Sequence, residues 1–324
     1  MIKAGIIGAA GYTAGELIRI LINHPDTEIA YLYSNSQSGQ AITSIHDDLL
    51  GQTPLKFTDE IKEADVVFLC QGHGKSKEFL DNHTFSDSTK IIDLSQDFRH
   101  QAQSQLGNRQ FVYGLPELNR SKIINAQNIA NPGCFATAIQ LALLPLAQAG
   151  LLQQEVHVNA ITGSTGAGQA PGGTTHFSWR NNNISIYKAF EHQHLIEITE
   201  SITSLQADFD QDINFIPVRG NFSRGILASA YTHFDGTAEE ALKLYQEFYA
   251  DAAFITVTDS SIHLKQVVNT NNAIVSVEKH KNKILVTSII DNLLKGASGQ
   301  AVENMNLMFG LDQSTGLRLK ANLF

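Results

Sequence analysis

The chain has 324 residues, of which 43% are hydrophobic and 17% are charged, so it can bury a large core, and its length suggests about two domains. A net charge of -9 without a long basic cluster argues against a nucleic-acid-binding surface, and no apolar run reaches the roughly 18 residues needed to cross a membrane. With two cysteines and no recognisable signal peptide, we expect a cytoplasmic protein that acts on small molecules.

The first half of the chain alternates short apolar runs with helical patterns. Strands are expected at KAGIIGA, TEIAYLYS, ADVVFLC, KIIDLS and NIANPG, and AGELIRILINHP carries apolar residues at helical spacing. Helices between short apolar strands predict a doubly wound parallel sheet of Rossmann type. We place this α/β domain at residues 1–134.

From about Glu155 the expected strands are longer and alternate in polarity. They lie at EVHVNAITGS, DINFIPVR, RGILASAYTHF and HLKQVVNT, and IVSVEKHKNKILVTSII is expected to form a hairpin. With the helix in GTAEEALKLYQEFYAD, they predict a second, α+β domain at residues 135–295, built on a largely antiparallel sheet with helices on one face. The closing helix, in KGASGQAVENMNLMFGL, has no strand after it, so we expect residues 296–324 to complete the first domain.

Several glycines lie between the first expected strand and the first helix. They permit a tight turn and the close approach of a pyrophosphate to the N–H groups at the helix start. The cofactor-binding residues predicted in this loop are Gly8, Gly11, Tyr12, Thr13 and Ala14. After the second strand, Ser34 and Ser36 carry no negative charge to repel a 2′-phosphate, which favours NADP(H) over NAD.

The two cysteines stand in different settings. Cys134 follows Asn131-Pro132-Gly133 and begins a helical pattern, where the positive end of the helix dipole favours the thiolate. Cys70 ends an apolar strand and is expected to be a packed core residue. A reactive thiol in a chain that also binds a dinucleotide suggests a thioester that exchanges hydride, in either aldehyde oxidation or acyl reduction.

Seven sequence blocks, in order over almost the whole chain, resemble the N-acetyl-gamma-glutamyl-phosphate reductase family, which is related to aspartate-semialdehyde dehydrogenase. The blocks are GIIGAAGYTAGEL, IIDLSQDFR, FVYGLPELNR, NIANPGCFATA, TGSTGAGQAP, YKAFEHQHLIEI and KGASGQAVENMNLMFG. The resemblance implies an NADPH-dependent enzyme of arginine biosynthesis that reduces N-acetyl-gamma-glutamyl phosphate to the semialdehyde. It also implies that Cys134 forms the thioester and that phosphate is released.

The resemblance also implies roles for other residues. His192 and His194 would lie on one side of an extended segment and supply the acid/base group, with His192 slightly preferred. A metal site is not expected, because no third His or Cys follows at a familiar ligand spacing. The loop TGSTGAG offers N–H groups for an anion nest. The remaining predicted cofactor-binding residues are Ser164, Gly166, Gln300 and Asn304, with Gly296 on the cofactor side. The predicted substrate-binding residues are Arg99, Asn131, Arg180 and Arg219, and Arg224 is a further candidate.

Val218 stands after Pro217 where many family members have a histidine, so the role of that histidine does not transfer. The altered contacts leave open an N-succinyl substrate with Arg219 at its extra carboxylate, and aspartyl or aminoadipyl phosphate are related alternatives. A dinucleotide-binding redox sensor without turnover is the alternative from another class. The second domain makes a homodimer or homotetramer reasonable.

Overall fold

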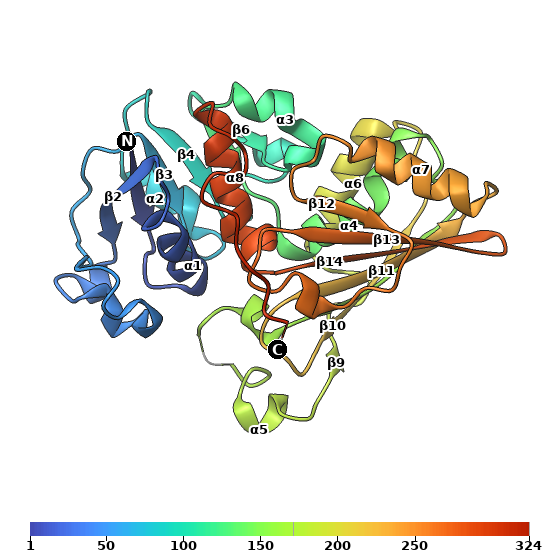
Figure 1. Ribbon diagram of the computed structural model, residues 1–324. Coiled ribbons are helices and arrows are strands. Elements are labelled where there is room, and N and C mark those ends of the chain that lie inside the picture. The colour runs from blue at the N-terminus through green and yellow to red at the C-terminus, as the bar shows by residue number, and fades with distance from the viewer. Residues whose placement is uncertain (171, 324) are drawn as a thin grey trace. The chain divides into compact units, whose positions relative to one another are not determined.

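The computed structural model describes residues 1–170 and 172–323 of the chain (Figure 1). The chain divides into two compact units, the first formed by Met1–Pro132 with Ala297–Arg318 and the second by Gly133–Gly296 with Leu319–Phe324. Within the described residues, each unit is built on one seven-stranded sheet. In the same residues, no helix is both long enough and apolar enough to cross a membrane.

The unit boundaries differ slightly from the predicted domain limits of 1–134 with 296–324. Cys134 begins a helix that packs in the second unit, so the first unit ends at Pro132. The last residues also belong to the second unit, because Asn322 N donates to Val268 O and Asn269 Nδ2 donates to Lys320 O.

The sheet of the first unit has the order β2-β1-β3-β4-β7-β6-β5 and is parallel except for β5. Its strands are β1 (Ile2–Ile7), β2 (Thr27–Tyr33), β3 (Val66–Leu69), β4 (Lys90–Asp93), β5 (Gln105–Leu106), β6 (Arg109–Tyr113) and β7 (Asn128–Ala130). Because β1 pairs with both β2 and β3, the chain runs from β1 to β2 on one side and then crosses to β3 on the other side of β1. Ligands of such sheets bind at the carboxyl ends of the strands at this reversal point.

Four helices accompany this sheet in the described residues: α1 (Tyr12–Leu21), α2 (Lys75–Asn82), α3 (Pro116–Ile124) and α8 (Gly299–Met308). Although α8 comes from the far end of the chain, it packs against α1 and α3 (red in Figure 1). Ser298 Oγ donates to Thr13 O at 2.6 Å, which ties the start of α8 to the first turn of α1. The closing helix is therefore an integral part of the first unit.

The sheet of the second unit has the order β12-β13-β14-β11-β8-β10-β9. Its strands are β8 (Val156–Thr162), β9 (Ser185–Ile186), β10 (Ile213–Arg219), β11 (Ile226–His233), β12 (Ile255–Thr258), β13 (Ala273–His280) and β14 (Lys283–Ile290). The pairs β12·β13 and β8·β10 are parallel and the other four are antiparallel. The predicted hairpin is confirmed as β13 and β14, and the fold-class prediction is confirmed for both sheets.

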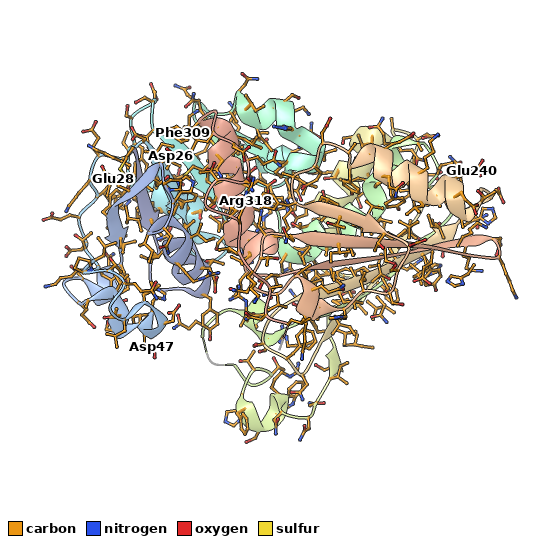
Figure 2. The ribbon with its side chains drawn as sticks, in the orientation of Figure 1. Asp26, Glu28, Asp47, Glu240, Phe309 and Arg318 are labelled. Atoms are coloured by element: carbon orange, nitrogen blue, oxygen red, sulfur yellow. The ribbon has the colours of Figure 1, made fainter. Side chains whose placement is uncertain are left out.

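Helices α4 (Cys134–Gln148), α6 (His194–Leu205) and α7 (Ala238–Phe248) lie on one face of this sheet (Figure 1). The inward side chains of β8, β11 and β14 bury against α4 to form the core of the unit. Helix α7 begins with a capping box in which Thr237 and Glu240 exchange hydrogen bonds, and Figure 2 shows Glu240 at this end of the helix. The short α5 (Phe177–Arg180) and β9 form an arm beyond β10 (Figure 1).

Two local predictions are wrong. HLKQVVNT contains a 3₁₀ turn, η6 (Leu264–Gln266), in place of a strand, because Gln266 Oε1 accepts the N–H of His263 at 2.7 Å and closes the turn. The segment around His194 is the start of α6 and not an extended strand, because Ile198 and Ile202 recur at helical spacing and bury together in the core.

Candidate active site

The glycine loop of the first unit lies at the carboxyl end of β1. Gly8 has φ +77°, and a side chain there would meet the Cys70 backbone at 3.0 Å, so only glycine fits this approach of β1 to β3. Gly11 is the N-cap of α1, whose first turn contains no acidic residue. Tyr12, Thr13 and Ala14 form that first turn. The loop and helix start therefore fit the pyrophosphate of a dinucleotide.

His46 supports this loop and was not anticipated from the sequence. Its Nε2 lies 2.8 Å from Ala9 O, and a side chain on Gly15 would come within 2.6 Å of its Nδ1. At the end of β2, Ser34 is buried and Ser36 is exposed in the turn η1 (Asn35–Gln37). No acidic side chain lies in that turn. Both serines stand at the carboxyl edge of the sheet, after the strand next to β1.

The other predicted residues of the first unit form one buried network. Arg99 Nε donates to Asn131 O at 2.8 Å, and Asn131 Nδ2 donates to Ala297 O at 3.0 Å. Asn304 Nδ2 donates to Gly114 O at 2.8 Å and lies 3.1 Å from Asn131 Oδ1. These side chains thus brace the turn after β7, where the chain leaves the first unit. Gln300 is fully buried on the same helix as Asn304.

Burial raises the pKa of the Cys70 thiol to about 12, so it stays protonated at neutral pH.

In the second unit, Cys134 is the first residue of α4, as predicted from the turn before it. Gly133, the N-cap, donates its N–H to Glu197 Oε2 at 3.0 Å. A side chain on Gly133 would come within 2.5 Å of His194 Nε2, so the imidazole lies directly against the residue before Cys134. His194 Nε2 and Glu197 Oε1 are 3.9 Å apart on the first turn of α6, and both side chains are buried. The residues Cys134, His194 and Glu197 therefore lie together at the start of α4.

His192 lies beside His194, with the two ring centroids 4.6 Å apart. His192 Nδ1 accepts the N–H of His194 at 3.2 Å, and the edge-on rings of Phe135 and Phe215 enclose it at 5.5 and 5.4 Å. Burial, with the positive charge of Lys188, lowers the pKa of His192 to about 4. His192 is therefore neutral at pH 7.

Arg180 and Arg219 form a cationic pair in the second unit. Arg180 Nη1 donates to Arg219 O at 3.1 Å, and Arg219 Cζ lies 4.6 Å from the ring centroid of Tyr187. Burial, and then the charge of Cys134, raise the pKa of Tyr187 to about 12. The Tyr187 and Cys134 side chains both pack against the core of the second unit. Within the described residues, Arg180 Nε and Nη2 and Arg219 Nε are buried without a hydrogen-bond partner. The pair is suited to bind an anion.

The glycine-rich loop after β8 does not form the predicted anion nest. Ser164 N donates to Phe222 O, Thr165 N to Ser223 O and Gly166 N to Gly163 O, so these N–H groups are already used within the protein. The segment is a 3₁₀ turn, η5 (Ser164–Ala167), packed against the loop between β10 and β11. Arg224, on that second loop, pairs with Asp291.

Comparison with known proteins identifies the family of this chain. Two models match the chain, the semialdehyde dehydrogenase NAD binding domain over residues 3–126 and the semialdehyde dehydrogenase dimerisation domain over residues 134–292. N-acetyl-gamma-glutamyl-phosphate reductase from Christiangramia forsetii is 62% identical over 325 residues, and that from Bacteroides fragilis is 56% identical over 326 residues, each alignment covering 100% of both chains. The chain belongs to the N-acetyl-gamma-glutamyl-phosphate reductase family.

Solved structures support the fold of this reductase family member. Aspartate semialdehyde dehydrogenase II of Vibrio cholerae, complexed with ASA, has a TM-score of 0.73 and 16% identity, covering 96% of this chain and 98% of that one. The aspartate semialdehyde dehydrogenase of Candida albicans, solved with NADP, has a TM-score of 0.71 and 12% identity, covering 95% and 99%. These likenesses concern the fold alone.

Three residues of the candidate site were not predicted from the sequence: His46, Tyr187 and Glu197. Glu197 follows His194 by one helical turn, so a helical reading of EHQHLIEI would have placed its carboxylate beside the imidazole. Tyr187 and His46 carry no signal in the sequence, since both act through tertiary contacts.

Proposed function

We propose that the chain reduces N-acetyl-gamma-glutamyl phosphate to N-acetylglutamate semialdehyde with release of phosphate, with Cys134 as the nucleophile. The observation that carries the proposal is the position of Cys134 at the start of α4, beside the His194–Glu197 pair, in a chain whose full-length relatives bear this reductase name. NADP(H) is the cofactor that the glycine loop and the serines after β2 would hold. When bound, NADPH supplies the hydride that reduces the acyl group.

His194 is the acid/base group in this proposal. It takes the proton of the Cys134 thiol, and the thiolate sulfur bonds to the γ-carbonyl carbon of the acyl phosphate. The carbon–oxygen bond to phosphate then breaks, with the proton passing from His194 to the leaving phosphate, and a thioester remains. Glu197 orients the imidazole and stabilises its charged form. The low pKa of His192 suits it to a neutral, packing role in this cycle.

After reduction of the thioester carbonyl, the thiohemiacetal collapses as its carbon–sulfur bond breaks. The semialdehyde leaves, and the Cys134 thiolate is protonated again from solvent through His194. The start of α4 supplies backbone N–H groups and a positive dipole end for the developing oxyanion and thiolate.

Arg180 and Arg219 would hold the anionic groups of the substrate, namely its phosphate or carboxylate. Burial, and then the charge of Arg219, lower the pKa of Arg180. This repulsion and the buried donors without partners favour an anion between the two side chains. In the reverse reaction, Arg219→Lys should raise the KM for phosphate or semialdehyde about tenfold, because lysine loses the planar contacts to Tyr187 and Thr174. Arg318→Lys, on the surface of the first unit (Figure 2), is the matched control.

The test of the function is phosphate-dependent reduction of NADP⁺ by N-acetylglutamate semialdehyde, run beside the N-succinyl compound and aspartate semialdehyde. Cys134→Ser and Cys134→Ala should abolish turnover, whereas Cys70→Ala should retain it. Near-parental turnover by Cys134→Ser would refute the covalent mechanism. NADPH binding without turnover on any semialdehyde would refute the reductase activity itself.

We also propose that the chain forms a homodimer or homotetramer through the face of the second sheet opposite its helices. Tyr231 and Asn159 are exposed on this face, and the matched model of residues 134–292 describes a dimerisation domain. Tyr231→Asp should shift the mass measured by light scattering towards the monomer.

A cytoplasmic location fits the two cysteines, which form no disulfide in the described residues.

A further inference from the structure

Asp291 is a fully buried carboxylate at the end of β14 that the proposed chemistry does not use. Its Oδ2 accepts Arg224 Nε at 3.0 Å and the N–H of Asn269 at 2.7 Å, and its Oδ1 accepts Arg224 Nη2 at 3.1 Å. Asn269 is held in the left-handed region at φ +73°, which non-glycine residues rarely adopt. Both oxygens of this buried carboxylate therefore have donors, and a fully satisfied buried polar network is rigid.

The same residue anchors η7, a turn of π-helix over Leu294–Ser298. Asp291 Oδ1 accepts the N–H groups of Leu293 and Leu294 at 2.8 and 3.1 Å, and Asp291 O accepts the N–H of Gly296 at 2.9 Å. One aspartate therefore holds both the beginning and the middle of the turn. π-Helical turns are rare and occur frequently at functional sites.

Gly296 is the part of η7 that contacts the nucleophile. A Cβ atom on Gly296 would lie 2.9 Å from Cys134 Cβ and 3.3 Å from Cys134 Cα, so the backbone of η7 lies directly against the cysteine. This contact restricts where the first residue of α4 and its side chain can lie. A shift of η7 by a few tenths of an ångström would change the space open to the thiol.

Asn292 extends the same anchoring to two loops. Its Oδ1 accepts the N–H of Gly225 at 2.7 Å, and its Nδ2 donates to Thr165 Oγ1 at 3.0 Å. Thr165 Oγ1 in turn donates to Ser223 O at 2.6 Å. The Asn292 side chain thereby holds two loops beside Asp291, namely the glycine-rich loop after β8 and the loop that carries Arg224.

We propose that Asp291 and Asn292 are positioning residues for the thiol of Cys134. Asp291, paired with Arg224, fixes η7, and Gly296 of η7 fixes the cysteine at the start of α4. The proposal rests on Cys134 being the nucleophile of the proposed function, and it assigns the segment DNLLKG the task of holding that nucleophile in its reactive position.

The experiment uses the full chain in a Cys70→Ala background, so that alkylation reports on Cys134 alone. The rate of alkylation by iodoacetamide, without substrate, is followed by mass spectrometry from pH 5 to pH 9 and compared with kcat and KM. The variants are Asp291→Asn, Asn292→Ala and Gly296→Ala, with circular dichroism to establish that each is folded. Val277→Ala, buried on β13, is the control for general destabilisation.

Asp291→Asn should change the dependence of the alkylation rate on pH and lower the maximal rate at high pH. It should also lower kcat about ten- to a hundredfold while KM changes less than about threefold, because a misplaced nucleophile slows chemistry more than binding. Gly296→Ala should give the same pattern while the Asp291–Arg224 pair stays intact. Alkylation and kcat values equal to those of Val277→Ala would overturn the proposal.

If Asp291→Asn does not fold, Asn292→Ala and Gly296→Ala decide, and unchanged alkylation in both overturns the proposal. If alkylation changes as expected but the parent enzyme reduces no acyl phosphate, the proposed function fails while the positioning of Cys134 is upheld.

Discussion

The Glu197 carboxylate accepts the N–H of Gly133 at 3.0 Å, one residue before Cys134, while its other oxygen lies 3.9 Å from His194 Nε2. One buried side chain thus joins the start of α4 to the first turn of α6. Both ends of the proposed proton path, the thiol and the imidazole, are fixed by the same carboxylate.

Glu197→Gln should lower kcat by about 10²-fold, a size expected of general acid–base support. The amide oxygen can still accept the Gly133 N–H, so the fold at the helix start is kept, but the negative charge that stabilises protonated His194 is lost. Steady-state kinetics with a thermal melt separates the two effects. Glu200→Gln, on the same helix, is the control and should retain kcat. A Glu197→Gln enzyme with kcat within twofold of the parent would contradict the pairing.

His192 predicts a pH dependence of stability. Its folded-state pKa of about 4 lies below the usual 6.5, so the unfolded chain takes up a proton first as the pH falls. The free energy of unfolding should therefore be fully retained above pH 6.5 and decline towards pH 4, by at most about 1.4 kcal/mol per pH unit from this group.

Urea unfolding at several pH values measures this slope. His192→Asn should reduce the slope between pH 6.5 and 4. Equal slopes in the parent and His192→Asn would show that burial does not hold this imidazole neutral.

Sequence patterns predicted most of the scaffold and only part of the site. The alternating polarity of β8 and β11 and the glycines at positions 8 and 11 are local signals, so the strands of the second sheet and the tight turn before α1 can be predicted from the sequence. The start of α6 was not predicted because the polar residues Glu191, His192 and Gln193 come directly before it, so the apolar helical spacing becomes visible only later in the segment. Spacing alone cannot reveal which distant groups meet.

The contact between Arg180 and Arg219 is one that sequence spacing does not predict. Arg180 comes from the arm beyond β10 and Arg219 from the end of β10 itself, so their contact depends on how the arm folds back. The predicted anion nest likewise depends on residues far away in the sequence. Its glycines gave the expected turn, but neighbouring carbonyls on the loop at Phe222 and Ser223 took its N–H groups, and nothing local predicts that competition.

The cofactor preference can be tested at Ser36, which is exposed after β2. Ser36→Asp places a carboxylate where a 2′-phosphate would bind, so the KM for NADPH should rise about tenfold or more while the KM for NADH changes little. Ser88→Asp, an exposed serine elsewhere in the first unit, is the matched control for added charge. Equal effects on both cofactors would argue that the serines after β2 do not face the 2′ position.

A proline inside α4 removes one hydrogen bond of the helix, and a tyrosine from outside the helix replaces it. Pro145 has no N–H to donate to Leu141 O, and Tyr249 Oη donates to that carbonyl at 2.7 Å from the turn after α7. Tyr249→Phe should leave a buried carbonyl without its donor and cost about 1 to 2 kcal/mol of unfolding free energy. Tyr33→Phe is the control, because no hydrogen bond of its hydroxyl is found within the described part of the chain.

A double-mutant cycle tests this account directly. In a Pro145→Ala background, the new N–H of residue 145 can bond Leu141 O within the helix, so the carbonyl no longer depends on Tyr249. The cost of Tyr249→Phe should therefore shrink by at least about half in that background, which is a coupling free energy well above the error of urea unfolding. If Tyr249→Phe cost the same with proline and with alanine at position 145, the tyrosine would stabilise the helix through ring packing, and the proline would be irrelevant to its role.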